Sequence, residues 1–179
     1  MENIFSTKER IKILKAVIYT KEIISVNSLA GRLKLSKGLV SKYLDILVKE
    51  SVLKRLNGKF MVANSAATKS FKIMLNIKKI PINILKRYAF IKAAGIYGSC
   101  AKGENNEESD VDIWIMIDEA SDQQLAEFSA RFKKKVEQAN LLFLTDKKIE
   151  KIKKEDSLFY HSLVFGSINI YGGDHGIQI

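Results

Sequence analysis

The first half of the chain alternates between apolar positions at helical spacing and short polar breaks. This spacing predicts helices over 7–20, 25–33 and 37–50, and the third buries one apolar stripe. Hydroxyl and amide side chains, which favour helix N-caps, stand at or near each start: Ser6 or Thr7, Asn27 and Ser36. Apolar runs on both sides of Asn57-Gly58 predict a hairpin, with strands at 52–56 and 59–62.

A connecting helix is predicted over 66–79, and Pro81, the only proline of the chain, marks a junction before a helix at 82–92. Beyond it the pattern changes to short apolar runs typical of buried strands. These runs predict strands at 93–97, 111–117 and 141–145, with a helix between the last two at 122–139. A final helix and strand follow within 156–172.

The chemistry is concentrated where the first of these strands ends and the second begins. Gly98-Ser99 ends one strand, and a polar loop leads to Ser109-Asp110-Val111-Asp112. Two carboxylates two residues apart share a face of an extended chain, where their repulsion is costly unless a cation lies between them. Hard divalent ions such as Mg²⁺ bind such oxygens together with substrate phosphates. A glycine lets the backbone approach a phosphate closely, and the Ser99 hydroxyl and neighbouring N–H groups can bind its oxygens.

The pattern G-S-x-A-x-G-x5-S-D-x-D resembles the DNA polymerase β-type nucleotidyltransferases, above all their small prokaryotic "minimal" branch. The likeness extends from about residue 82 to 172, where the end of the chain resembles the closing helix and strand of that branch. It implies Asp110 and Asp112 as catalytic metal ligands for Mg²⁺ or Mn²⁺. It also implies that Gly98, Ser99 and Ser109 bind a nucleoside triphosphate substrate.

Active members of the family carry a third carboxylate on the strand after the long helix. In this chain that position falls on Asn140, with Glu137 a turn earlier and Asp146 at the far end of the strand as alternatives. An amide oxygen can bind a hard cation but has no charge and accepts no proton. With Asn140 in that position turnover would be feeble, whereas the intact remainder of the motif favours an active enzyme.

The three helices and hairpin at about 5–63 resemble a winged helix-turn-helix domain, with Ser51 where that family usually has glycine. The resemblance implies duplex DNA as a partner, bound through six positions. Those on the third helix would enter the major groove and those on the hairpin would meet phosphates: Lys37, Ser41, Lys42, Lys54, Arg55 and Lys59. A dimerisation or protein-docking module is the alternative, because a fold does not fix a function.

Charge separates the two halves of the chain. Residues 1–90 hold 19 Lys and Arg against 5 Asp and Glu, while residues 91–179 hold 11 against 15. This asymmetry favours a nucleic-acid-binding first half and a different role for the second. No apolar run reaches the roughly 20 residues of a membrane span, so no membrane partner is expected. A single cysteine excludes internal disulfides and favours a cytoplasmic protein.

These inferences give an α+β protein of two domains. A winged helix domain with its connecting helix occupies 1–80, and a small mixed α/β nucleotidyltransferase domain, with helices packed on a short sheet, occupies 81–179. The expected reaction transfers a nucleoside monophosphate from a triphosphate to an acceptor hydroxyl. Alternatives are a catalytically degenerate nucleotide-sensing DNA-binding regulator, an antitoxin paired with a HEPN-type ribonuclease toxin, and a purely structural DNA-binding protein. A second copy of the chain, forming a homodimer, is a further possible partner.

Overall fold

A computed structural model describes residues 4–172 of the chain, and these form two compact units. One unit comprises residues up to Lys72 together with 106–108. The other comprises 73–105 and the chain from Ser109 onward. Within residues 4–172, no helix combines the length and apolar character needed to cross a membrane.

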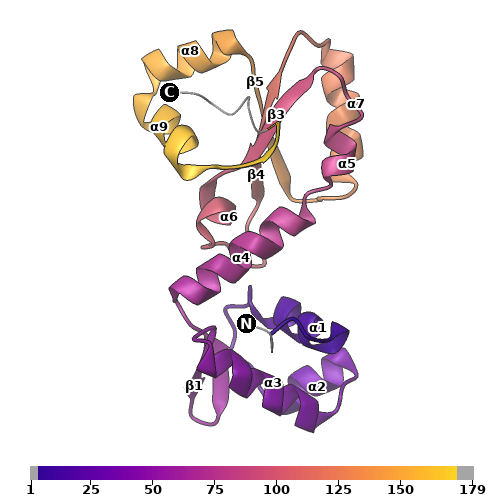
Figure 1. Cartoon of the computed structure of the whole chain (residues 1–179), viewed down its shortest axis with the longest axis vertical. Coiled ribbons are helices and arrows are strands. Elements are labelled where there is room, and N and C mark those ends of the chain that lie inside the picture. Colours follow the sequence, from indigo (N-terminus) through magenta and orange to yellow (C-terminus); the bar gives the residue numbers. More distant parts are fainter. Residues whose placement is uncertain (1–3, 173–179) are drawn as a thin grey trace. The chain divides into compact units, whose positions relative to one another are not determined.

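The first unit contains three helices followed by a hairpin, in the predicted order (Figure 1). The elements are α1 (Lys8–Val17), α2 (Val26–Leu33), α3 (Lys37–Lys49), β1 (Leu53–Leu56) and β2 (Lys59–Val62). The predicted apolar stripe of α3 is buried, and Tyr43 joins it with its hydroxyl donating to the Ile4 carbonyl at 2.9 Å. Asn57 and Gly58 both have positive φ, as a tight two-residue hairpin turn requires.

The helix caps confirm most of the predicted starts. Thr7 and Ser36 accept from backbone N–H groups three residues ahead, at 3.2 and 3.3 Å. The prediction of Asn27 as a cap was wrong. Ser25 caps α2 through the Ser28 N–H, so that Asn27 lies exposed inside the first turn. The corner residue Ser51 has φ +58°, the left-handed conformation that glycine would adopt at less cost.

Helix α4 (Ala66–Lys79) follows, with bounds equal to the prediction. The second unit contains a four-stranded sheet of order β5-β4-β3-β6. The strands are β3 (Ile91–Ile96), β4 (Val111–Ile117), β5 (Ala139–Leu144) and β6 (Ile168–Tyr171). Strand β3 is antiparallel to both β4 and β6, whereas β4 and β5 are parallel and joined through a helix. The parallel pair therefore brings the start of β4 beside the start of β5.

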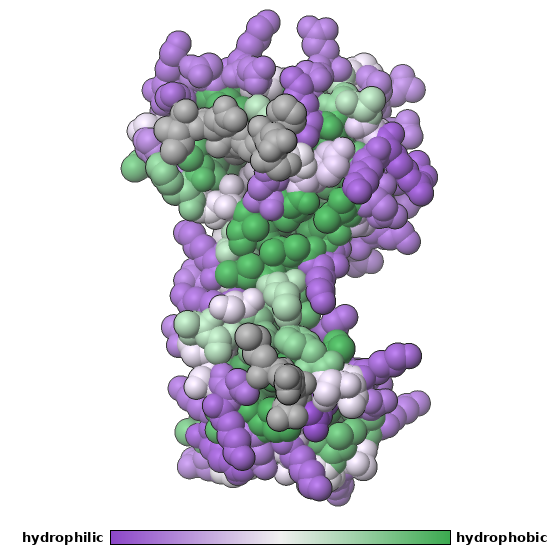
Figure 2. All heavy atoms as spheres, viewed as in Figure 1, coloured by the Kyte–Doolittle hydropathy of each residue, from purple (hydrophilic) through white to green (hydrophobic). Residues whose placement is uncertain are grey.

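Helices cover both faces of this sheet (Figure 1). On one face, α5 (Ile82–Leu85) and α7 (Asp122–Lys133) pack over Ile113 and Ile115 of β4. On the other face, α8 (Asp146–Glu155) and α9 (Ser157–Gly166) pack over Trp114. Figure 2 shows hydrophilic side chains over the outward surfaces of α7 and α8. The short α6 (Gly98–Lys102) stands between β3 and β4 in the chain.

Two predicted helices are shorter than their patterns indicated. The helix predicted over 82–92 ends at Leu85, because Tyr88 turns inward to pack edge-on against Phe128, with ring centroids 5.1 Å apart. The helix predicted over 122–139 ends at Lys133. Val136 stays buried in the following turn, and β5 then begins at Ala139, two residues before the predicted strand. Helix α8 was not predicted.

Candidate active site

The turn after β3 fixes the geometry of the site, and it requires a glycine. Gly98 has φ +65°, and a Cβ at this position would lie 2.6 Å from Oδ2 of Asp112. The preceding backbone is held to the same residue, since the Tyr97 N–H donates to the Asp112 carbonyl at 3.0 Å. The Asp112 carboxylate is therefore seated directly against the Gly98 backbone, where any larger residue would displace it.

Asp110 and Asp112 occupy different local environments. Asp112 is half-buried within β4, whereas Asp110 is exposed and lies just before the strand begins. The backbone carbonyl of Asp110 accepts a 3.4 Å hydrogen bond from the Cys100 thiol in α6. Cys100 occupies a variable position of the glycine motif, and through this hydrogen bond its small buried side chain supports the backbone of Asp110.

The charges of Asp110 and Asp112 contribute to raised pKa values in two neighbouring groups. Burial raises the pKa of the Cys100 thiol to about 11, and the charges of Asp112 and Asp110 add to the rise while Lys79 opposes it. The pKa of the Tyr97 hydroxyl is likewise raised, first by burial and then by the charge of Asp112. A divalent cation would neutralise the negative charge of these two carboxylates.

Asn140 occupies the position beside Asp112. The two residues are register partners in the parallel β4–β5 pair, and the Asn140 Nδ2 donates to Asp112 Oδ1 at 3.1 Å. Among residues 4–172, no group of three His, Cys, Asp or Glu side chains could hold a metal ion. Neither Glu137 nor Asp146 therefore completes the carboxylate pair in the described part of the chain.

Glu137 and Asp146 lie elsewhere for simple topological reasons. Glu137 is exposed in the turn before β5. Asp146 follows the opposite end of that strand, where it adds to the raised pKa of Lys92, the ion-pair partner of Asp118. Since β4 and β5 are parallel, the end of β5 lies beside the end of β4, and Asp112 lies near the start of β4.

A buried amide pair that the sequence analysis missed supports the loop before Asp110. Asn76 on α4 and Asn105 exchange side-chain hydrogen bonds of 2.9 and 3.2 Å, and both residues are at least 95% buried. Asn76 also donates to the Cys100 carbonyl at 2.9 Å. The loop is polar in sequence, and its acids Glu107 and Glu108 are exposed. No local sequence pattern marks Asn105 as the buried residue of this loop.

The residues predicted to bind the triphosphate surround the same turn. Ser99 is half-buried in the first turn of α6, and its carbonyl accepts from the Glu104 N–H at 2.9 Å. Ser109 is half-buried immediately before Asp110. Gly98, Ser99 and Ser109 thus come from the two segments that flank Asp112, so the structure brings the predicted nucleotide-binding and metal-binding residues to one end of the sheet.

The residues predicted to bind DNA lie in the first unit. On α3, Lys37 and Lys42 are exposed and Ser41 is half-buried. On the hairpin, Lys54 and Lys59 are exposed. Arg55 differs from them, because its guanidinium pairs with Asp45 of α3 and lies 5.1 Å from the centroid of the Phe60 ring. This arginine joins the hairpin to α3 and is less available to a ligand than the lysines on either side of it.

Comparison with known proteins identifies the second unit. The family model described as "Polymerase beta, Nucleotidyltransferase" matches residues 78–175, more than half of the chain. The chain therefore belongs to this nucleotidyltransferase family. One similar solved structure is that of a provisionally assigned nucleotidyltransferase from Sulfolobus solfataricus, with 14% identity and a TM-score of 0.43. The match covers 65% of this chain and 97% of that one. Among proteins of curated function, none matches the chain.

Proposed function

We propose that the second unit is a metal-dependent enzyme that transfers a nucleoside monophosphate from a nucleoside triphosphate to an acceptor hydroxyl. This proposal rests chiefly on the close packing of the Asp112 carboxylate against Gly98, two residues after Asp110, in a chain of the nucleotidyltransferase family. In this reaction the acceptor oxygen forms a bond to the α-phosphorus, and the bond between the α-phosphorus and its bridging oxygen breaks. Pyrophosphate leaves, and the hydroxyl proton is released to water.

The donor set suits a hard divalent ion. Asp110 and Asp112 supply two carboxylates, and Asn140 can supply an amide oxygen if its side chain turns over. Mg²⁺ or Mn²⁺ held by these groups would align the attacking and leaving oxygens and neutralise the charge that develops between them. Ser99 and Ser109 would donate hydroxyl hydrogen bonds to phosphate oxygens, and the absence of a side chain at Gly98 would let the phosphates approach the backbone.

A second function has one observation in its favour. Asn140 stands where active family members are expected to carry a third carboxylate, and an amide cannot accept the proton of the attacking hydroxyl. A catalytically degenerate unit that binds nucleotide and metal without transfer would act as a sensor. Both functions share the same binding step, so they differ in turnover and not in affinity.

For the first unit we propose a winged helix that binds duplex DNA. Its support is the order of three helices and a hairpin, extended by a bridge between Ile24 and Phe60, and the exposed lysines of α3 and the hairpin. A recognition helix with basic residues near its start is suited to the major groove, and basic residues on a wing are suited to phosphates. DNA binding would place the second unit near nucleic acid.

Isothermal titration calorimetry tests the metal site. Wild-type protein should bind a nucleoside triphosphate more tightly in Mg²⁺ or Mn²⁺ than in EDTA, and Asp112→Asn should lose this metal dependence. The matched control is Asp118→Asn, which removes an exposed charge just beyond the other end of β4, where Asp118 pairs with Lys92. Metal-independent nucleotide binding that is equal in wild type and Asp112→Asn would refute the site. Transfer of radiolabel to acceptors in a whole-cell lysate then separates enzyme from sensor.

A further inference from the structure

A row of three residues crosses the sheet at the candidate active site, and the proposed reaction does not use one of them. Asp112 of β4 is the register partner of Asn140 on one side. On the other side, the Tyr97 N–H donates to the Asp112 carbonyl at 3.0 Å, just beyond the pair of Ile96 with Ile113. Tyr97 and Asn140 are therefore the two cross-strand neighbours of Asp112.

Tyr97 lies on the same face of the sheet as the Asp112 carboxylate. Asp112 precedes Trp114 by two residues on β4, so these two side chains share a face. The Tyr97 ring is half-buried against the core cluster that contains Trp114, and so is the Phe159 ring of α9. Among the described residues, these are the two partly buried aromatic side chains packed against that cluster. The carboxylate thus has an aromatic surface beside it.

The geometry of the two rings leaves aromatic surface available to a ligand. The ring centroids of Tyr97 and Phe159 lie 6.2 Å apart, with an angle of 70° between the planes, so the rings meet edge to face. Such a contact covers one face of one ring only. Phe159 is fixed in the first turn of α9, where its N–H donates to the Asp156 carboxylate at 2.9 Å. Its ring can therefore hold the Tyr97 ring in a constant orientation.

The part of a nucleoside triphosphate that fits this surface is the base. In the proposed reaction the α-phosphate lies at the metal, and the nucleoside is bonded to that phosphate. The nucleoside therefore begins beside Asp112, where Tyr97 is a neighbour. A base is flat and carries no charge, and every base can stack on an aromatic ring. A phosphate gains little from the negative face of such a ring.

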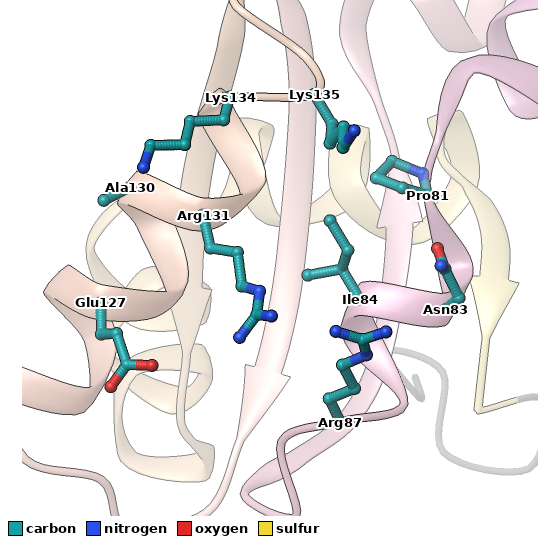
Figure 3. Close-up of a pocket in the computed structure, with 9 residues that line it drawn as sticks. All are labelled: Pro81, Asn83, Ile84, Arg87, Glu127, Ala130, Arg131, Lys134 and Lys135. Atoms are coloured by element: carbon teal, nitrogen blue, oxygen red, sulfur yellow. The ribbon is translucent and has the colours of Figure 1, made fainter.

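The opposite face of the sheet is less suited to the nucleoside. A pocket of about 740 Å³ lies there between α7 and the segment around α5, and Arg87 and Arg131 extend into it (Figure 3). Ile84 lines this pocket and belongs to the same core cluster as Ile113, whose side chain points away from the Asp112 face. None of the described residues that line the pocket is aromatic. Neither its position nor its lining suits a base stacked beside the carboxylate.

We propose that Tyr97 is the residue on which the base of the donor triphosphate stacks, and that Phe159 positions the Tyr97 ring. The phosphates are then bound at Gly98 and Ser99, directly after Tyr97 in the chain. Because stacking is available to every base, the site accepts the four nucleoside triphosphates with similar affinity. This inference rests on the proposed function, since it concerns how the same site binds its nucleoside.

Isothermal titration calorimetry with the full-length protein and Mn²⁺ tests this role, with no acceptor present. The two probes are ATP and inorganic tripolyphosphate, which has the phosphates but no base. Tyr97→Leu should raise the Kd for ATP about tenfold, a typical loss for one stacked base, and leave the Kd for tripolyphosphate within about twofold. Tyr97→Phe keeps the ring and should bind both probes within about twofold of wild type. Phe159→Leu should weaken ATP alone, by a smaller factor.

The matched control is Tyr171→Leu. Tyr171 is also half-buried and lies on β6, the other neighbour of β3, but it packs against the cluster on the opposite face. Both Kd values of this variant should stay within about twofold of wild type. Tripolyphosphate binding shows in each variant that the phosphate and metal site is still folded. In wild type, the Kd values of the four nucleoside triphosphates should agree within about fivefold.

Several outcomes would overturn the stacking role. Equal loss of ATP and tripolyphosphate in Tyr97→Leu would mean that the ring supports the fold of the site and not the base. Unchanged ATP binding in that variant would place the base elsewhere. A loss in Tyr97→Phe as large as in Tyr97→Leu would assign the contact to the hydroxyl. Strong preference for one triphosphate would require hydrogen bonds to the base edges, which stacking does not supply.

The stacking role and the proposed function fail in different ways. Metal-dependent tripolyphosphate binding that is lost in Asp112→Asn supports the proposed function without reference to Tyr97. If that binding is intact and Tyr97→Leu has no selective effect on ATP, the stacking role alone is refuted. Binding of neither probe by wild type would refute both. Tyr97-dependent ATP binding without transfer to any acceptor would support the stacking role in a sensor.

Discussion

The Asn140 side chain donates a hydrogen bond of 3.1 Å to the Asp112 carboxylate, across the parallel pairing of β5 with β4. A Cβ at position 98 would lie 2.6 Å from the other oxygen of the same carboxylate, so only a glycine leaves room for it there. Asp112 is thus flanked on two sides by groups that carry no charge. Within the described residues no group of three His, Cys, Asp or Glu side chains could hold a metal ion, and an amide such as that of Asn140 cannot accept a proton.

We predict that Asn140→Asp raises the rate of nucleotide transfer, by about tenfold or more. The change restores a charge and a proton acceptor at nearly constant shape, and a positioned general base commonly contributes 10²–10⁴-fold. Radiolabel transfer under single-turnover conditions measures the effect. Glu137→Gln is the control and should leave transfer unchanged, because Glu137 is not grouped with the carboxylates. Abolished transfer in Glu137→Gln would show that this side chain supplies the third carboxylate.

The same variant has a signature that does not depend on turnover. Without metal, Asn140→Asp brings a carboxylate against Asp112 in place of a hydrogen-bond donor, so repulsion should lower the melting temperature. Mg²⁺ or Mn²⁺ should then stabilise the variant more than wild type, since a ligand that binds only the folded state raises its stability. A thermal melt with and without metal measures both shifts. Equal metal stabilisation in the two proteins would argue against a shared cation.

Gly98→Ala should disrupt the site at its narrowest point. The left-handed φ of +65° costs a side-chain-bearing residue about 1–2 kcal/mol, and the new Cβ must also push the Asp112 carboxylate away. We expect a loss of about that size in the free energy of unfolding and a loss of metal-dependent nucleotide binding. Gly31→Ala in α2 is the control, because nothing lies within 4 Å of its Cβ position. That change should stabilise the protein by about 0.5–1 kcal/mol. Intact nucleotide binding in Gly98→Ala would contradict the close seating of Asp112.

Asn76→Ala should destabilise the second unit by about 1–3 kcal/mol. The change removes the Asn105 partner in a buried pair and also removes the donor to the Cys100 carbonyl. Urea unfolding measures the effect, with the exposed Asn83→Ala as the control. In the double variant Asn76→Ala/Asn105→Ala the losses should be less than additive, since each single change already breaks the pair. Additive losses would mean that the two amides act independently.

For the first unit we predict binding to duplex DNA that weakens steeply as salt rises. Lys42→Ala should weaken binding, and Lys54→Ala should lower the salt slope by about 0.9 if it removes one phosphate contact. Lys15→Ala, an exposed lysine on α1, is the control. Arg55→Ala should act partly through stability, because Arg55 pairs with Asp45 and lies over Phe60. Absence of a gel shift at low salt would favour a protein-docking module.

Much of the fold follows from local patterns in the sequence. The bounds of α4 and β4, the hairpin at Asn57-Gly58 and the caps Thr7 and Ser36 are confirmed, because each depends on residues close together in the chain. The family could likewise be identified from the glycine and aspartate motif. Such features are encoded by periodicity, turn chemistry and short spacing, which a single sequence displays directly.

Features that depend on distant contacts were missed or misjudged. The helix after Pro81 ends early because Tyr88 packs against Phe128, some forty residues away, and the buried pair of Asn76 with Asn105 carries no local signal. The pocket lined by Arg87 and Arg131 is likewise assembled from separate elements, the turn after α5 and helix α7. Asn140 shows most clearly where local sequence information ends and tertiary structure is needed. The sequence placed an asparagine near the third carboxylate position with two acids as rivals. Only the parallel pairing of β4 with β5 brings Asn140 to Asp112, because strand register is fixed by packing across the sheet.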